Sequence, residues 1–149
     1  MDQINHAERA AALFKEGYNC AQSVFAAYHE ELGLDQATAL KLASSFGGGM
    51  GRLREVCGAL TGLFMVAGMK YGYADPQDLA AKKAHYQRIQ DLARQFRTEY
   101  GSILCRDIIP PESASTDPTP EPRTDAYYRQ RSCADYVRYA AGLLDEYQE

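Results

Sequence analysis

The chain has 149 residues, of which 46% are hydrophobic and 24% charged, and its formal net charge is -4. This length and composition are typical of one globular domain with a buried core, so we assign residues 1–149 to a single domain. The negative charge and the lack of any Lys/Arg block argue against binding to nucleic acid and against binding to an anionic membrane.

Three helices are expected in the first third of the chain. Apolar residues recur at helical spacing over residues 3–16. Asn19 is a good N-cap for a second helix, which places Cys20 at its first helical position and ends near Gly33. Asp35 is expected to cap a short third helix.

A glycine-rich stretch, Gly47–Gly51, follows and leads into Arg52 and Arg54. It lacks the Gly-Lys-Ser/Thr ending of a Walker loop, and no strand precedes it as a dinucleotide fingerprint requires. Two interpretations remain open. The stretch is either a flexible connector or an anion-binding nest of backbone N–H groups.

An uncharged run, Val56–Met69, predicts the central helix of the fold, which we expect to span about Leu53–Tyr71. The run is shorter than the ~20 apolar residues that cross a bilayer, so no membrane span is expected. Gly58 and Gly62 lie on one face of this helix, and small residues at that spacing let a neighbouring backbone approach closely.

The second half of the chain predicts two further long helices. One starts at Asp75-Pro76 and ends at Gly101, followed by Cys105 at the head of a short helical segment. Residues 110–125 hold five of the six prolines and are expected to form a surface loop. The last helix spans about 125–147, or restarts at Ser132 with a capping box to Asp135. The fold class is therefore all-α, a bundle of five to six helices.

The four cysteines, Cys20, Cys57, Cys105 and Cys133, match no zinc or ferredoxin spacing. The chain begins without the features of a secretory signal, so we expect a cytoplasmic protein, in which permanent disulfides are not expected. What suggests a common site is the position of the cysteines, because each is expected near a helix N-terminus. Helix N-termini and cations lower thiol pKa values, and arginines stand nearby. These arginines are Arg52, Arg54, Arg106 and Arg131. The alternative is that each cysteine is a small buried hydrophobe.

The residues Cys57-Gly58-Ala59-Leu60-Thr61-Gly62 match the Cys-Gly-Ala-x-x-Gly motif of the C-GCAxxG-C-C family, a bacterial-type family of proteins described as redox-active. The chain resembles this family over essentially its whole length. Cys20 fills the upstream cysteine position, and Cys105 and Cys133 fill the two downstream positions. The resemblance implies a redox protein with four cysteines. Some relatives resemble exported proteins, which suggests a bound cluster in those relatives. This sequence shows no such export signal, so that implication does not carry over, and the resemblance implies no substrate.

Three functional hypotheses follow. The first is a metal centre for electron transfer, an iron–sulfur cluster or a zinc ion bound by the four cysteines. The second is metal-free thiol/disulfide chemistry with Cys57 and Cys20 as the catalytic thiols. The third is a non-redox helical module that binds a small molecule or a partner and has only structural cysteines. The residues expected to support a four-cysteine centre are Gly58, Gly62, Arg52, Arg54, Arg106 and Arg131.

Whether the protein is an enzyme stays open at this stage. A redox partner protein and a homodimer are the partners we consider. The apolar face of the helix that starts at Asp75, or the Gly58/Gly62 face, would form the dimer contact. No histidine stands at a recognisable metal-ligand spacing from another ligand.

Overall fold

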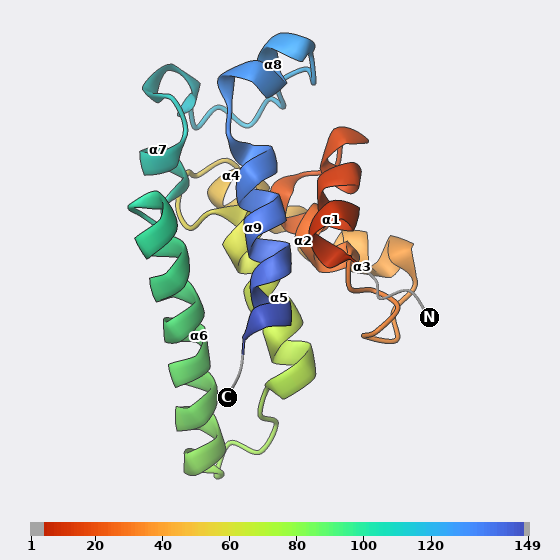
Figure 1. The fold of residues 1–149 in the computed structure, drawn as a ribbon, viewed down its shortest axis with the longest axis vertical. Helices are drawn as coiled ribbons and strands as arrows, with labels where there is room; N and C mark the ends of the chain where they lie inside the picture. The colour runs from red at the N-terminus through yellow and green to blue at the C-terminus, as the bar shows by residue number, and fades with distance from the viewer. Residues whose placement is uncertain (1–4, 148–149) are drawn as a thin grey trace.

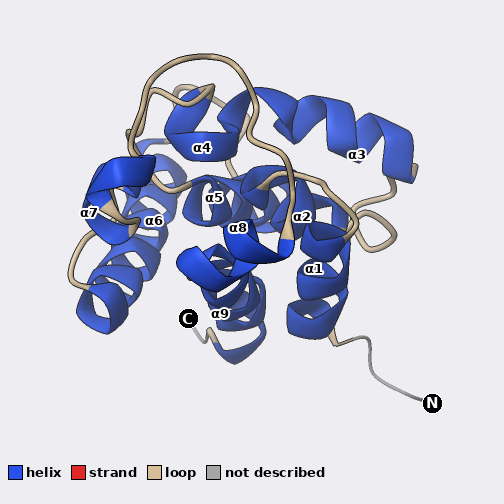
Figure 2. Ribbon diagram, turned by 90° about the horizontal axis from the view of Figure 1, so that it is seen from above, coloured by secondary structure: helices blue, strands red, loops and turns tan. Residues whose placement is uncertain are grey.

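The computed structural model describes residues 5–147, and the regular structure within them is helical (Figure 1, Figure 2). This confirms the all-α class. The helices are α1 (His6–Lys15), α2 (Cys20–Ala26), α3 (Gln36–Ala43), α4 (Gly47–Met50), α5 (Gly58–Tyr71), α6 (Leu79–Tyr100), α7 (Cys105–Ile108), α8 (Asp125–Gln130) and α9 (Cys133–Glu146). Two short 3-10 helices, η1 (Ser44–Phe46) and η2 (Pro111–Ser113), lie between them.

The core forms where α1, α2, α5 and α9 pack against one another. Helix α5 is apolar on all sides, which suits its position in contact with α2, α9 and α6. Its side chains Leu60 and Leu63 are fully buried. Burial of each such side chain contributes about 1.5–3 kcal/mol. The long helix α6 runs along one flank, and α3 lies on the other (Figure 1). In the part of the chain that the structure describes, no helix is long and apolar enough to cross a membrane.

The expected close contact at Gly58 and Gly62 is confirmed, and the neighbour is α2. A Cβ atom at Gly58 would lie 2.5 Å from Cys20 Sγ, and one at Gly62 would lie 2.8 Å from the carbonyl oxygen of Ala21. Only a residue without a side chain leaves room for the backbone of α2 at this distance. The two glycines therefore fix how close Cys20 comes to α5.

The central helix begins later than its apolar pattern predicts, at Gly58 instead of Leu53. Arg54 has a left-handed backbone, with φ of 62°, which a helix cannot continue through. The next residues pair instead with the segment before α7. The Cys57 N–H donates to Ile103 O at 2.8 Å, and the Cys105 N–H donates to Glu55 O at 2.6 Å. This short antiparallel bridge sets Cys57 beside Cys105 in the fold.

Two other helix starts differ from the prediction because of local capping. Helix α1 starts at His6, since the Asn5 side chain accepts from the Glu8 N–H at 3.1 Å; residues 3 and 4 of the expected helix lie outside the described residues. Helix α6 starts at Leu79, since Asp78 accepts from the Ala81 N–H at 3.0 Å. The predicted start at Asp75-Pro76 is therefore wrong.

Two expected long helices are interrupted. The second helix ends at Ala26, and turns continue from there to Gly33, which has a left-handed φ of 72°. The last helix divides into α8 and α9, so the restart at Ser132 is correct. The capping box is wrong, because the Ser132 side chain makes no cap hydrogen bond.

The Pro-rich segment, residues 110–125, is a loop over most of its length, as predicted, and arches past α4 on its way to α8 (Figure 2). Two arginines that follow the glycine-rich stretch hold this loop in place. Arg52 Nε donates to Asp117 O at 2.6 Å, and Arg54 Nε donates to Ser115 O at 2.9 Å. The Pro-rich segment and the glycine-rich stretch thus lie against each other.

Candidate functional site

Each of the four cysteines lies at the start of a helix. Cys20, Cys105 and Cys133 are the first residues of α2, α7 and α9, and Cys57 immediately precedes α5. The expected placement near helix N-termini is confirmed. All four line a single cavity of about 60 Å³ and are free thiols in the structure.

Contacts already described explain how distant parts of the chain meet at this cavity. The glycine face of α5 brings α2 close, so Cys20 approaches the start of α5. The backbone bridge between Val56 and Leu104 brings Cys105 there. Cys133 completes the set because α9 packs on both α2 and α5. The site is therefore a product of helix packing and not of sequence spacing.

Three of the thiols have raised pKa values, in contrast to the expectation that helix N-termini and arginines would lower them. Burial raises the pKa of Cys20, raises that of Cys57 far above its ordinary value, and raises that of Cys133 to about 12. Neighbouring cysteine charges raise all three further. The prediction of lowered values was wrong because loss of water outweighs the positive surroundings. These thiols stay protonated at neutral pH unless a bound cation replaces their protons.

Backbone N–H groups surround the sulfur atoms. Gly48 and Ala21 hydrogen bond to Cys20, and Ala59 and Leu60 hydrogen bond to Cys57. Gly48 has a left-handed φ of 67°, which turns the glycine-rich stretch toward α2. Successive N–H groups of this kind favour anionic sulfur, as in many iron–sulfur sites.

Arg54 and Arg131 bring positive charge to the cavity wall. Arg54 is only 3% exposed, and its Nη1 lies 3.6 Å from Cys105 Sγ. Its Nη2 atom is buried and has no hydrogen-bond partner. Arg131 is also buried and pairs with Glu121 at 2.6 Å. A buried guanidinium favours an anionic neighbour, so both residues suit a cavity that holds thiolates.

The other residues expected to support the site lie in different places. Gly58 lines the cavity, whereas Gly62 lies one turn further along α5, where it contacts α2. Arg52 lines a neighbouring cavity instead. Arg106 points outward and pairs with Glu55 at 3.1 Å, with 48% of its side chain exposed. Proximity to Cys105 in sequence does not bring the Arg106 side chain to the sulfur atoms.

Arg123 and Tyr127 also line the cavity, and the sequence analysis did not single them out. Arg123 donates to Phe14 O and Tyr18 O, both at 2.9 Å, and stacks over the Phe14 ring at 4.3 Å. It lies in the Pro-rich segment, where no periodic pattern indicates which side chains point inward. No signal in the sequence identifies it.

The donor set determines which metal groups the cavity fits. Four thiols are the ligands that iron–sulfur clusters and structural zinc both use. Among residues 5–147, however, no three His, Cys, Asp or Glu side chains are grouped tightly enough to hold one metal ion as they stand. The four thiols therefore match both groups in ligand type, and they reach the cavity from four separate chain segments.

The fold and the site define a helical protein with a buried four-cysteine cavity. A family model described as "Putative redox-active protein (C_GCAxxG_C_C)" matches residues 18–147. The chain belongs to this family, as its resemblance predicted. No curated protein and no solved structure matched the chain.

Proposed function

We propose that the protein transfers single electrons through an iron–sulfur cluster held by Cys20, Cys57, Cys105 and Cys133. The observation that carries this proposal is that four thiols from four separate chain segments line one cavity. Four inert core cysteines have no reason to meet at a common space. Their meeting therefore speaks against the hypothesis of purely structural cysteines.

The protein's own residues each have a part in this proposal. The four cysteines would hold the group, and burial of Cys57 and Cys105 would keep water away from it. N–H groups at Gly48 and Ala59, together with the Arg54 guanidinium, would offset the negative charge of the thiolates. A bound cluster supplies a one-electron couple whose potential depends on hydrogen bonds to sulfur and on burial.

Zinc is a less suitable occupant. A structural zinc ion needs four ligands in tetrahedral contact with one point. The four thiols supply the right kind of ligand for zinc. Zinc gives no redox change of its own, however, so it would not support electron transfer.

Metal-free thiol chemistry is the second candidate, and the contact at Gly58 favours it. The missing side chain lets Cys20 lie against the start of α5, next to Cys57. The two thiols would form a disulfide by losing two protons and two electrons to a partner. This reaction needs an attacking thiolate, and burial raises the pKa of both thiols. We therefore rank it second.

Metal analysis of anaerobically purified protein tests the proposal. We expect iron and acid-labile sulfide in stoichiometric amounts, and loss of both in each of the four single Cys→Ser variants. Arg106→Gln is the matched control, because its side chain points away from the cavity, and it should keep the iron of the unaltered protein. Folded protein without metal would overturn the proposal, and bound zinc without sulfide would replace the cluster with a single ion. Circular dichroism establishes that each variant is folded.

An electron-transfer protein requires a donor and an acceptor, so we propose a redox partner protein as well. The homodimer and the cytoplasmic location remain predictions from sequence.

A further inference from the structure

A second and larger cavity, of about 420 Å³, adjoins the cysteine cavity. The two share part of their walls, because Arg54, Arg123 and Arg131 line both. The second cavity adds Arg52, residues of the glycine-rich stretch, and Pro118, Pro120 and Glu121 of the Pro-rich segment. It lies where that segment faces the glycine-rich stretch.

Positive charge dominates the wall of this second cavity. Four guanidinium groups face it, and Glu121 supplies its one carboxylate. Glu121 is shared between two of the arginines, with Oε2 at 2.6 Å from Arg131 Nη2 and Oε1 at 3.6 Å from Arg52 Nη2. Within residues 5–147, neither Arg54 nor Arg123 has a carboxylate within ion-pair distance. The wall therefore carries more positive charge than its own residues neutralise.

Arg54 differs from the other arginines of this wall because it is almost fully buried and one of its donors has no acceptor. Its side chain is almost fully buried, and while Nε and Nη1 have acceptors, Nη2 has none. A buried charged donor without an acceptor is costly, and proteins rarely leave one unsatisfied. Gly48 makes room for this arrangement, since a Cβ atom there would lie 3.0 Å from Arg52 Cγ and 3.7 Å from Arg54 Nη1.

We propose that the second cavity binds a small molecule through an oxyanion group, which accepts hydrogen bonds from the guanidinium groups of the cavity wall. Phosphate and carboxylate groups match the planar donor fork of arginine. The volume falls in the range of about 300–1,000 Å³ that is usual for small-molecule sites. The Glu121 carboxylate pairs with two of the arginines that such a group would contact. The bound molecule would lie directly beside the cysteine cavity.

Isothermal titration calorimetry of the reduced full chain, at constant ionic strength, tests this site. The probes are inorganic phosphate, pyrophosphate and, as a reference for nonspecific ion binding, chloride. We expect saturable binding of one phosphate or pyrophosphate per chain and none of chloride. Tighter binding of pyrophosphate than of phosphate would indicate that the natural ligand extends beyond a single oxyanion.

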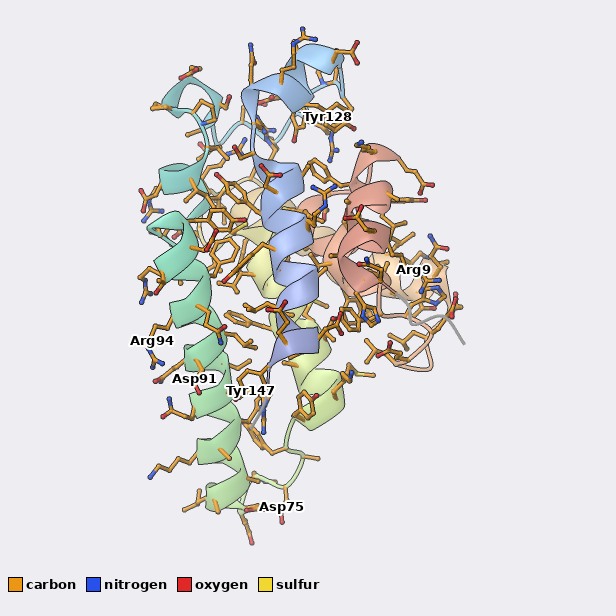
Figure 3. All side chains as sticks on the ribbon, viewed as in Figure 1. Arg9, Asp75, Asp91, Arg94, Tyr128 and Tyr147 are labelled. Atoms are coloured by element: carbon orange, nitrogen blue, oxygen red, sulfur yellow. The ribbon has the colours of Figure 1, made fainter. Side chains whose placement is uncertain are left out.

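Three variants test which residues form the oxyanion site. Arg54→Gln should weaken binding by tenfold or more. Arg94→Gln is the matched control: Arg94 lies on the outer side of α6 (Figure 3), with 62% of its side chain exposed, and binding should not change. Glu121→Gln should tighten binding severalfold, because a competing carboxylate is removed. This third variant keeps the test valid if Arg54→Gln does not fold.

Absence of saturable binding in both the unaltered protein and Glu121→Gln would overturn the proposal. Unchanged affinity in folded Arg54→Gln would overturn it too, as would equal binding of chloride. None of these results depends on iron, so the proposals for the cysteine cavity and for the oxyanion site can fail separately.

Discussion

Replacement of Gly62 by alanine tests whether close packing of α2 on α5 builds the site. The added Cβ atom would lie 2.8 Å from Ala21 O and 3.1 Å from Val24 Cβ, both on α2. The first contact is with backbone, which cannot move aside without shifting α2 and Cys20. Overpacking of this kind costs about 1–3 kcal/mol. Alanine also gains about 1 kcal/mol over glycine in a helix interior.

The free energy of unfolding should therefore fall by about 1–2 kcal/mol, because a clash with fixed backbone costs more than the gain from alanine. For a chain of this size that loss lowers Tm by roughly 2–8 °C. Gly68→Ala is the matched control in the same helix, since a Cβ atom there meets nothing within 4 Å. It should raise stability by about 0.5–1 kcal/mol.

Thermal and urea unfolding followed by circular dichroism measure both variants. Because the clash displaces Cys20 from the cavity, Gly62→Ala should also bind less iron than Gly68→Ala. If the two variants had equal stability, α2 would not rest on the glycine face of α5, and the account of how Cys20 reaches the site would be refuted.

Two further predictions concern the pKa of Cys133 and the ion pairs of His6. Burial raises the Cys133 pKa from 9.0 to about 12, so the folded state favours the thiol. Metal-free protein should therefore lose stability as pH rises from 9 toward 12. The rate of Cys133 alkylation, followed by mass spectrometry, should still rise about tenfold per pH unit above pH 9. An alkylation rate that levels off at pH 9 would contradict the burial of this thiol. His6 stacks on Tyr28 and contacts Glu31 at 2.6 Å and Asp145 at 3.0 Å. His6→Phe keeps the stack but should cost about 1–3 kcal/mol in urea unfolding. Arg9→Ala is the reference, because it removes the exposed ion pair with Glu30 and should lower the free energy of unfolding by only about 0–1 kcal/mol. Equal losses in the two variants would show that the buried contacts of His6 add no stability.

Local features of the chain were predictable from sequence because local physics determines them. Asn19 and Asp35 cap their helices through their own side chains, at 2.8 Å and 3.2 Å from the N–H groups of Gln22 and Thr38. The helix-start position of Cys20 follows from the Asn19 cap, whereas no side-chain cap hydrogen bond marks the helix starts at Cys57, Cys105 and Cys133. The apolar run after Cys57 also identified the central helix, because an uncharged run that is apolar on every face requires burial.

The assembly of the site was not predictable, because long-range contacts determine it. The left-handed backbone of Arg54 is unusual for a residue with a side chain, and it ends the expected helix extension before Cys57. The pairing of Val56 with Leu104 joins segments that no sequence pattern connects. Arg123 reaches the cavity from a loop without periodicity. The sign of the thiol pKa shifts likewise depends on burial, which only the packed fold reveals.

A potentiometric titration of anaerobically prepared protein, followed by optical absorption, tests the central claim most directly. If the four cysteines hold one cluster, the protein should show a reversible one-electron couple, with about 59 mV per tenfold change in the ratio of oxidised to reduced protein. Each single Cys→Ser variant should lose that couple. A slope of about 30 mV, the value for a two-electron dithiol/disulfide pair, would contradict the claim. A couple that survives the loss of any one cysteine would contradict it as well.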